Sequence, residues 1–316
     1  MARLTTDKLR GIWAGATMTW DEKYRFDEET YAKNIRRLID SKVHGIYTTG
    51  STGEFYAVEY DEFCRMVDIQ AELCGKAKMP LQIGCCSDTT SKTIKLLEYT
   101  AAKKEVSAAQ VVLPYWMELS DREVLQFFKD LHTACPDLPL VHYNIPRAKR
   151  FLTGEDYVKI LDVVPNLIGV KFTFAGTHFG QLQRSIIMTP HIAYFVAEDL
   201  LASAMQLGAR GCYSSLVMTN PAFMLELYNL ADTGQWDKAV KMQQQASSFF
   251  TDVVEFVQSL GEHIMDPLFD KALAVASGFA LGHQRCRPPY ISFEDQTVTA
   301  LRDWLKTNYP QFIYPI

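Results

Sequence analysis

The sequence has no long apolar segment of the kind that crosses a membrane. No run of about 18 consecutive apolar residues occurs, so a transmembrane helix is not expected. The chain opens on MARLTTDKLRG, where no apolar run follows the basic residues, and this pattern predicts no secretory signal peptide. We therefore expect a cytoplasmic protein.

Cysteine and histidine occur without the spacings that bind metals or form redox pairs. The seven cysteines form no C-x-x-C pair and the seven histidines show no metal-ligand spacing, so neither a metal site nor a cofactor is expected. Most of the cysteines stand in apolar runs, which predicts reduced, buried thiols. They are Cys64, Cys74, Cys85, Cys86, Cys135, Cys212 and Cys286.

No excess of charge and no internal division is present either. The 32 Lys and Arg residues against 37 Asp and Glu residues give a net charge of −5, which indicates no nucleic-acid or membrane-surface partner. We find no linker, low-complexity tract or internal repeat. The 316 residues fit one barrel of about 250 residues with a terminal extension.

The sequence does contain a regular alternation of short apolar runs and longer amphipathic ones. The apolar runs are nearly continuous, as in parallel strands that are buried on both faces. They lie at residues 11–19, 45–50, 81–86, 109–114, 138–145, 167–174, 192–198 and 211–216. Helical patterns lie between them, for example at residues 28–41, 61–74, 91–104, 121–135, 155–164 and 200–207. Asp27, Ser120 and Thr153 stand where helix N-caps are expected.

Eight such alternations predict an α/β fold, a (β/α)8 TIM barrel with a C-terminal helical extension. An open doubly wound sheet is the alternative. We place the barrel through strand 8 in residues 1–225, and the last barrel helix and the extension in residues 226–316, as one structural unit. A break in the extension is expected at residues 287–289 (RPP).

Lys171 is the first candidate for chemistry. In a barrel of this kind the active site lies at the C-terminal ends of the strands, and Lys171 stands in the sixth apolar run. Burial lowers the pKa of a lysine, so that its free amine can attack a carbonyl carbon. The alternative is a lysine at the mouth of a strand that extends into solvent.

Two other features stand at strand ends. Tyr143 ends the fifth run, where a phenol can relay protons, although a core tyrosine gives the same pattern. Residues 50–54 (GSTGE) follow the second run, and their glycines allow a tight turn that can hold a carboxylate, although a plain turn is the alternative. Glu198 and Asp199 are interpreted as the start of a helix, not as substrate contacts.

Together the GSTGE turn, the segment YNIP at residues 143–146 and the segment GVK at residues 169–171 resemble the dihydrodipicolinate synthase / N-acetylneuraminate lyase family. The resemblance extends over about residues 11–289. It implies a class I aldolase, usually a homotetramer, that needs no metal or organic cofactor. It implies that Lys171 forms a Schiff base with pyruvate or a related 2-keto acid, and that Tyr143 relays protons.

The same resemblance assigns roles around the turn. Gly50, Ser51 and Thr52 would bind the keto-acid carboxylate, and the Thr52 hydroxyl would join the proton relay. Tyr213 falls where the family places a backbone carbonyl near the substrate.

Two positions depart from the synthases of this family. These usually have two tyrosines after the proline of the fourth strand, whereas Trp116 fills the second place here and has no hydroxyl to relay a proton. Their arginine that binds the aldehyde's carboxylate stands two places after the proline of the Tyr-Asn-x-Pro motif. Here Arg147 follows Pro146 directly, so its role is open. Both departures argue against the synthase reaction.

Three segments are similar to the hydratase-aldolase branch, which splits arylidene-pyruvates into pyruvate and an aromatic aldehyde. They are PYWM at 114–117, CYSS at 212–215 and CRPPY at 286–290. That branch usually has phenylalanine where Thr52 stands and asparagine where Ile145 stands.

We therefore expect a Schiff-base lyase or aldolase that acts on a 2-keto acid and an apolar or aromatic aldehyde, with Trp116 and Tyr213 shaping the pocket. One alternative is a dihydrodipicolinate synthase-like enzyme. Another is a 2-keto-3-deoxy sugar acid aldolase or dehydratase, or an N-acetylneuraminate-type lyase, against which Trp116, Phe174 and Tyr213 argue. A third is a non-catalytic keto-acid-binding barrel. The expected partners are these small molecules and further copies of the chain, as a homotetramer or dimer, with neither nucleic acid nor membrane.

Overall fold

The computed structural model describes residues 3–173 and 178–315, and its centre is a closed parallel barrel. Each strand pairs in parallel with the next in the sequence, and the eighth pairs with the first. The strands are β1 (Gly11–Gly15), β2 (Gly45–Tyr47), β3 (Leu81–Gly84), β4 (Ala108–Val111), β5 (Leu140–Asn144), β6 (Leu167–Phe172), β7 (Ala193–Val196) and β8 (Gly211–Ser214). This closure confirms the predicted (β/α)8 barrel, and the open-sheet alternative is wrong.

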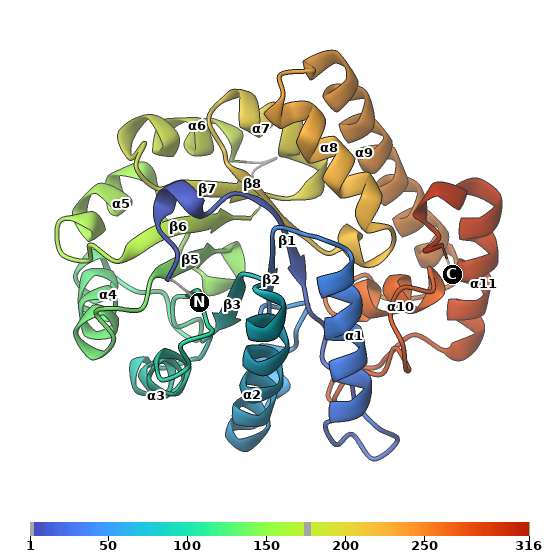
Figure 1. Ribbon diagram of the computed structural model, residues 1–316, viewed down its shortest axis with the longest axis horizontal. Helices are drawn as coiled ribbons and strands as arrows, with labels where there is room; N and C mark the ends of the chain where they lie inside the picture. Colours follow the sequence, from blue (N-terminus) through green and yellow to red (C-terminus); the bar gives the residue numbers. More distant parts are fainter. Residues whose placement is uncertain (1–2, 174–177, 316) are drawn as a thin grey trace.

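Helices surround the barrel in sequence order (Figure 1). They are α1 (Glu28–Asp40), α2 (Tyr60–Ala77), α3 (Thr90–Ala101), α4 (Asp121–Ala134), α5 (Gly154–Leu161), α6 (Phe179–Met188), α7 (Leu201–Gln206) and α8 (Pro221–Asp232). Short 3-10 turns lie at η1 (Thr6–Lys8), η2 (Phe55–Ala57), η3 (Pro146–Ala148), η4 (Glu198–Leu200), η5 (Leu216–Met218) and η6 (Pro310–Phe312).

Local sequence explains where several helices begin. The carboxylate of Asp27 accepts a hydrogen bond from the backbone N–H of Thr30 (3.1 Å). Ser120 and Thr153 each form a capping box with the acidic residue three places further on. The three predicted N-caps are therefore confirmed, and each satisfies a backbone donor that the first turn of a helix leaves free.

The strands are shorter than the apolar runs that predicted them. The first run covers residues 11–19, but β1 ends at Gly15 and residues 16–19 form a buried loop. The run at residues 167–174 ends as β6 at Phe172, and Phe174 lies outside the described residues. The loops at the C-terminal end of the barrel are buried here because the extension packs against them. The apolar sequence of each run therefore continues beyond the residue at which the strand ends.

The interior of the barrel is filled with side chains, as in other barrels of eight strands. Those at its centre are Leu4, Leu9, Trp13, Tyr47, Ala108, Val141, Ile168, Ala193, Phe195 and Tyr213. Part of this interior is polar: the Tyr213 hydroxyl donates to Gln82 Oε1 (2.7 Å), and Gln82 Nε2 donates to Gln110 Oε1 (3.2 Å). The floor beneath the site therefore combines aromatic packing with buried hydrogen bonds.

The predicted extension consists of α9 (Trp236–Ser259), α10 (Leu268–Ala276) and α11 (Asp295–Asn308), beside α8 and α1 (Figure 1, orange to red). Arg37 of α1 donates to the carbonyl of Gly278 (3.0 Å), which joins the extension to the barrel. Residues 287–289 lie between α10 and α11 and are not helical, as predicted. The boundary expected at residue 225 falls within α8.

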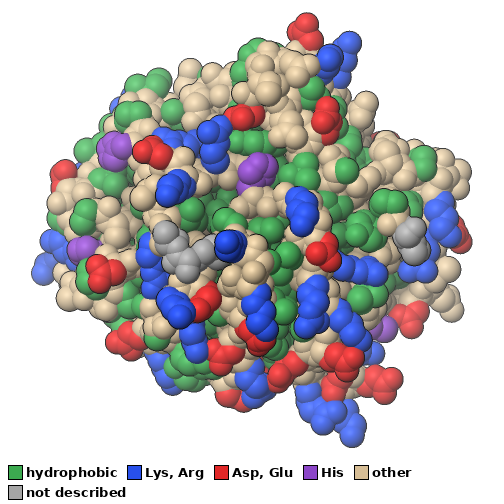
Figure 2. Space-filling view, viewed as in Figure 1, with side chains coloured by type: hydrophobic (Ala, Val, Ile, Leu, Met, Phe, Trp, Pro, Cys, Tyr) green, Lys and Arg blue, Asp and Glu red, His purple; other side chains and the backbone are tan. Residues whose placement is uncertain are grey.

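The described part of the chain has no helix long and apolar enough to span a membrane. On the face shown in Figure 2, acidic and basic side chains are intermixed. All seven cysteines are unpaired thiols; six of them are buried and Cys64 is partly exposed.

Candidate active site

Parallel pairing of β5 with β6 places Tyr143 directly beside Lys171 at the C-terminal end of the barrel. The lysine is partly buried, and its Nζ lies 4.3 Å from the centre of the Tyr143 ring. The two strand-end residues that the sequence singled out are therefore neighbours in space.

Two more phenol rings surround the same nitrogen. The ring centres of Tyr47 and Tyr213 lie 4.9 and 5.7 Å from Lys171 Nζ, and Nζ lies 3.5 Å from the Tyr47 hydroxyl, at the limit of a hydrogen bond. The faces of aromatic rings attract cations. This arrangement therefore favours positive charge at a nitrogen that is otherwise largely removed from water.

Burial lowers the pKa of Lys171, and the carboxylates of Asp266, Glu198 and Asp270 oppose that shift only in part. Desolvation disfavours the ammonium form because the low-dielectric surroundings solvate charge poorly. A larger fraction of the amine is thus neutral near pH 7 than in an exposed lysine, as a nucleophile requires.

Tyr143 is hydrogen-bonded to the turn that follows β2. Its hydroxyl lies 2.8 Å from Ser51 Oγ, and both groups are buried. Burial raises the pKa of the Tyr143 phenol above its ordinary value, with a further contribution from Asp266, while the Ser51 hydrogen bond opposes the shift. The phenol is therefore protonated at neutral pH and can donate a proton through hydroxyls to a bound group.

Thr52 has a different partner from its neighbour. Its hydroxyl donates to Asp270 Oδ2 of α10 at 2.6 Å, and both side chains are buried. The structure therefore joins Ser51 with Tyr143, and joins Thr52 with a carboxylate from the extension.

The turn at residues 50–54 uses much of its own hydrogen-bonding capacity. The N–H of Gly53 donates to the carbonyl of Gly50, and the N–H of Glu54 donates to that of Ser51. A Cβ added at Gly53 would come 2.7 Å from the backbone nitrogen of Thr49, so this close approach requires glycine. These two amides are already occupied, which leaves the hydroxyls as the more available groups for an anion.

Glu54 anchors the turn to the extension. Its fully buried carboxylate is paired with Lys271 of α10, and it accepts hydrogen bonds from Trp20 Nε1 (3.0 Å) and from the backbone N–H of Arg287 (2.9 Å). A buried carboxylate needs partners of this kind because its desolvation is costly. The extension therefore supplies the groups that hold the turn in place.

A cavity of about 220 Å³ lies above Tyr143 and Ser51. Its walls are mostly aromatic and apolar, and its polar groups include the ion pair between Arg147 and Asp266 (2.8 Å). The lining residues are Ser51, Phe55, Tyr56, Val112, Tyr115, Tyr143, Ile145, Arg147, Ala148, Met265, Asp266 and Tyr290.

The remaining sequence candidates lie around this cavity, not in its wall. The side chain of Trp116 is 76% exposed, and that of Tyr213 points into the barrel interior beneath Lys171. Gly50 lies close to Tyr47, Gln110 and Tyr143. In this single chain neither Trp116 nor Tyr213 lines the 220 Å³ cavity, so their expected contact with the second substrate stays a prediction.

Glu198 begins η4, as the sequence interpretation expected. Its Oε1 accepts hydrogen bonds from Ser214 Oγ (2.9 Å) and from the N–H groups of Ser215 (2.7 Å) and Leu216 (3.0 Å). This carboxylate therefore ties the end of β7 to the loop after β8.

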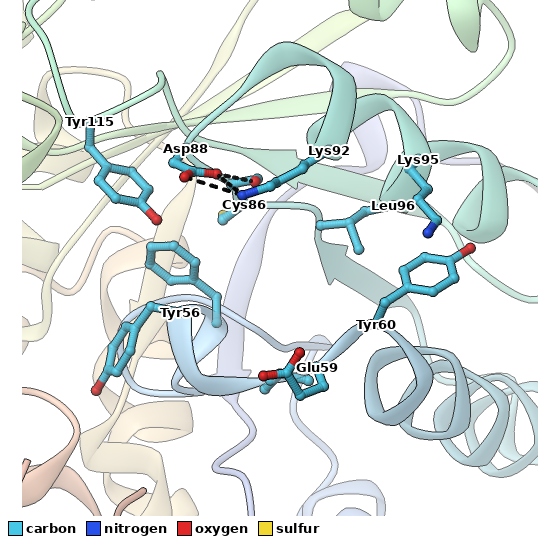
Figure 3. Close-up of a pocket in the computed structure, with 12 residues that line it drawn as sticks. Tyr56, Glu59, Tyr60, Cys86, Asp88, Lys92, Lys95, Leu96 and Tyr115 are labelled. Atoms are coloured by element: carbon cyan, nitrogen blue, oxygen red, sulfur yellow. Dashed lines mark hydrogen bonds and ion pairs between the residues drawn. The ribbon is translucent and has the colours of Figure 1, made fainter. Parts of the chain in front are cut away.

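A second cavity, of about 420 Å³, adjoins the first and shares Phe55, Tyr56 and Tyr115 with it. Figure 3 shows Tyr56 and Tyr115 at one end of this cavity, with Lys95 and Tyr60 at the other. Between the two ends lies an ion pair in which Lys92 Nζ is 3.0 Å from Asp88 Oδ1. The larger cavity is thus the more polar one, and the smaller is the one that reaches Tyr143.

Tyr47 and Asp270 belong to the site but were not predicted from the sequence. Tyr47 ends β2, a strand whose residues are all buried, so the sequence does not show which of its side chains face the interior of the barrel. Asp270 and Lys271 stand together inside the otherwise apolar segment LFDKALAVA, and two charges in such a helix could have indicated a buried pair. No group of three or more His, Cys, Asp or Glu side chains in the described ranges is arranged to hold a metal ion.

The sequence model of the Dihydrodipicolinate synthetase family matches residues 8–308. A 4-hydroxy-tetrahydrodipicolinate synthase of Ehrlichia canis (strain Jake) is 29% identical over 254 residues, which cover 80% of this chain and 84% of the synthase.

Solved structures share the fold. YagE of Escherichia coli K12, described as a prophage protein of the dihydrodipicolinic acid synthase family in complex with pyruvate, superposes with a TM-score of 0.83 at 21% identity. The match covers 95% of this chain and 98% of YagE. N-acetylneuraminate lyase of Fusobacterium nucleatum gives 0.81 at 20% identity, covering 95% and 99%. With the family match over nearly the whole length, the chain belongs to the dihydrodipicolinate synthetase family and is a lyase of the class I aldolase type.

Proposed function

We propose that Lys171 forms a Schiff base with pyruvate or a related 2-keto acid, and that the enzyme uses it to make or break a carbon–carbon bond. The observation that carries this proposal is the environment of the Lys171 amine. Its pKa is lowered by burial, it sits at the end of a barrel strand, and it lies 4.3 Å from the ring of a phenol that is bonded to Ser51. The pyruvate complex of YagE supports the choice of keto acid.

The reaction begins when the neutral amine of Lys171 attacks C2 of the keto acid. The nitrogen loses one proton as the carbonyl oxygen gains one, and a second proton on that oxygen lets it leave as water, which produces an iminium. Tyr143 and Ser51 are placed to pass these protons, because their hydroxyls lie 2.8 Å apart. The cationic nitrogen is then surrounded by the rings of Tyr143, Tyr47 and Tyr213.

The iminium withdraws electrons from C3, so loss of a C3 proton yields an enamine. Attack of C3 on an aldehyde carbon forms the new bond, and the reverse sequence breaks it. Water then adds to C2 and releases the lysine. The covalent intermediate divides one difficult step into easier ones, and the lysine nitrogen serves as the electron sink. In this scheme no metal or organic cofactor takes part.

Reduction with borohydride tests the proposal. Incubation with pyruvate and borohydride should add the mass of one reduced pyruvate adduct, and peptide mapping should place it on Lys171. Lys171→Ala should show no adduct. An adduct on another lysine, or none in the native protein, would refute the assignment.

For the second substrate, the comparisons favour a dihydrodipicolinate synthase-like reaction over the hydratase-aldolase interpretation. The Ehrlichia canis relative carries the synthase name. Arg147 also lines the cavity; one of its nitrogens is paired with Asp266, and a guanidinium has further N–H donors with which to bind an aldehyde that bears a carboxylate. The shift of one place from the family position does not remove it from the site.

An aromatic or apolar aldehyde remains the second candidate, because the same cavity is walled by Phe55, Tyr56, Tyr115 and Tyr290. Rates with pyruvate and a panel of aldehydes separate the two. A carboxylated aldehyde preferred by the native enzyme, with the preference lost in Arg147→Ala, supports the synthase-like reaction. An aromatic preference unaffected by that change supports the hydratase-aldolase branch.

A sugar-acid substrate and a purely binding role have less support. A polyhydroxylated sugar acid needs many polar partners, and the wall of this cavity is mostly aromatic and apolar surface. A non-catalytic barrel does not fit membership in a family of lyases. A homotetramer or dimer stays a prediction, which light scattering on the purified chain would test.

A further inference from the structure

Asp270 is a buried carboxylate from the extension that touches the candidate carboxylate-binding turn. Its side chain is 7% exposed, and its Oδ2 accepts the hydroxyl of Thr52 at 2.6 Å. Nearby cations have other partners: Lys271 is paired with Glu54, and Arg147 with Asp266. The charge of Asp270 is therefore stabilised mainly by hydroxyl groups.

Other acids make its ionised form less favourable still. Burial raises the pKa of Asp270 to about 7; Asp266 and Glu198 contribute to the increase, and the hydrogen bond from Thr52 opposes it. The hydroxyl of Ser215 is a second hydrogen-bond partner that favours the ionised form.

Four further titratable groups face this carboxylate from other parts of the chain. The two bases are Lys171 and Arg147. The two neutral acids are the phenol of Tyr47 and the thiol of Cys286. Of these, Lys171 changes its charge distribution during the proposed reaction, so any test has to separate its titration from that of Asp270.

The direction of one hydrogen bond depends on this protonation state. A threonine hydroxyl has one proton to donate, and an ionised carboxylate only accepts. While Asp270 is ionised, the Thr52 proton points at it, and Thr52 offers only lone pairs to any other partner. Once Asp270 is protonated, its own O–H can donate to Thr52 Oγ1, and the Thr52 proton is free to point at a bound anion.

We propose that Asp270 is a positioning residue that takes up one proton when a 2-keto acid binds and thereby turns the Thr52 hydroxyl toward the keto-acid carboxylate. The proton comes from solvent, and no bond of the substrate changes in this step. The inference rests on the proposed function, because it assumes that the carboxylate binds at Ser51 and Thr52.

Binding of the keto-acid anion itself favours protonation of Asp270. A keto-acid carboxylate placed near Thr52 adds a negative charge beside Asp270, Asp266 and Glu198, and like charges at close range favour protonation of one of them. Above the pKa of Asp270, each pH unit should weaken pyruvate binding by about tenfold. Binding then requires the uptake of one proton, and the proton concentration falls tenfold with each pH unit.

The test measures how half-saturation by pyruvate depends on pH, with borohydride-trapped adduct as the readout, so that no aldehyde is needed. In the native enzyme, half-saturation should rise steeply between pH 7 and pH 8.5. Asp270→Asn should remove that rise, because an asparagine amide donates to Thr52 at every pH. Thr52→Val should reduce it, with weaker binding throughout, whereas the matched control Thr52→Ser should keep it.

Proton counting gives an independent readout. Calorimetry of pyruvate binding at pH 8 in buffers of different ionisation enthalpy measures protons taken up, and the native enzyme should take up about one more than Asp270→Asn. The native enzyme is compared with Asp270→Asn because the iminium on Lys171 also carries a proton, and subtracting the two values removes that contribution. Thr52→Val and Thr52→Ser provide the comparison if Asp270→Asn does not fold.

Two outcomes would overturn the inference. If an adduct forms normally and its pH dependence is the same in the native enzyme, Asp270→Asn and Thr52→Val, Asp270 has no such role although the Schiff base stands. If no adduct forms in any protein, the proposed function fails and this inference with it.

Discussion

At Lys171 the surroundings act on the nitrogen in opposite directions before and after condensation. Desolvation favours the neutral amine that attacks the keto acid. The three tyrosine rings favour the cation that follows, because their faces attract the positive charge of the protonated iminium. A site with burial alone would help the first step and hinder the second.

Tyr143→Phe should slow adduct formation by roughly 10²- to 10⁴-fold, the usual contribution of a positioned proton-transfer group, with little change in half-saturation by pyruvate. The ring remains to pack over Lys171, so the change isolates the hydroxyl. Single-turnover trapping measures the rate. Tyr99→Phe, which removes a hydroxyl that bonds to Asp68 between two helices, is the control. Equal rates in the two variants would remove Tyr143 from the relay.

The pH dependence of trapping reports the lysine. Adduct formation requires the neutral amine, so its rate at saturating pyruvate should rise with pH and level off above the pKa of Lys171. That midpoint should lie below the ordinary 10.5, because burial lowers the pKa. A midpoint at or above 10.5 would contradict a desolvated amine.

Residues that end strands were the ones that sequence could identify. Lys171, Tyr143 and Ser51 follow from the rule that strand ends carry the site, and the structure does bring Tyr143 against the other two. The partner of Thr52 could not be predicted, because Asp270 lies 218 residues away along the chain and no local pattern relates the two. Long-range pairs of this kind depend on how the extension folds back.

Among the elements, the segment between α10 and α11 contains an arginine, Arg287, that binds it to the barrel. Both nitrogens of the Arg287 fork bond to Glu62 of α2 (2.6 and 2.7 Å), and its guanidinium lies 3.9 Å from the centre of the Trp20 ring. A planar fork makes two parallel bonds and stacks on a ring, which a lysine ammonium cannot reproduce.

Arg287→Lys should therefore destabilise the protein by about 1–3 kcal/mol, the usual effect of losing hydrogen bonds to charged groups. Urea unfolding measures the change. Arg25→Lys provides the control, since this arginine is largely exposed and pairs with Asp21 on the surface. A loss no larger than that of the control would mean that the segment is held by its other contacts.

The ion pair between α10 and the turn gives a sharper test of the same element. Lys271→Met leaves the Glu54 carboxylate buried without its cation, which should cost about 3–5 kcal/mol. Glu54→Gln combined with Lys271→Met should recover part of that loss, because no buried charge is then left unpaired. Thermal unfolding of the single and double variants checks this, and a double variant less stable than Lys271→Met would refute it.

Helices and strands were predicted to different accuracy. The caps at Asp27, Ser120 and Thr153 fix helix starts through local hydrogen bonds, so sequence identified them. Strand ends were placed too late, as at Gly15, because burial of the following loop by distant elements keeps that loop apolar. Periodicity detects burial, and it cannot distinguish a paired strand from a buried loop.

At the scale of the whole molecule, no disulfide links the described part of the chain, since all seven cysteines are unpaired. Burial also raises the thiol pKa of the interior cysteines, to about 12 in Cys74 and Cys86, so the reactive thiolate is scarce. Alkylation of the native protein should therefore modify Cys64 first, and the other six only after unfolding. Mass spectrometry over time checks this. Rapid labelling of a buried thiol would show that the barrel opens locally.

The anchoring of the turn at residues 50–54 also bears on how the enzyme is made. Its partners Asp270, Lys271 and Arg287 are synthesised more than 200 residues after it. A nascent chain on the ribosome can therefore close all eight strands while Glu54 still lacks its cation. Such a barrel would hold Lys171 but not a fixed turn beside it, so activity should appear only after the last of these partners has left the exit tunnel.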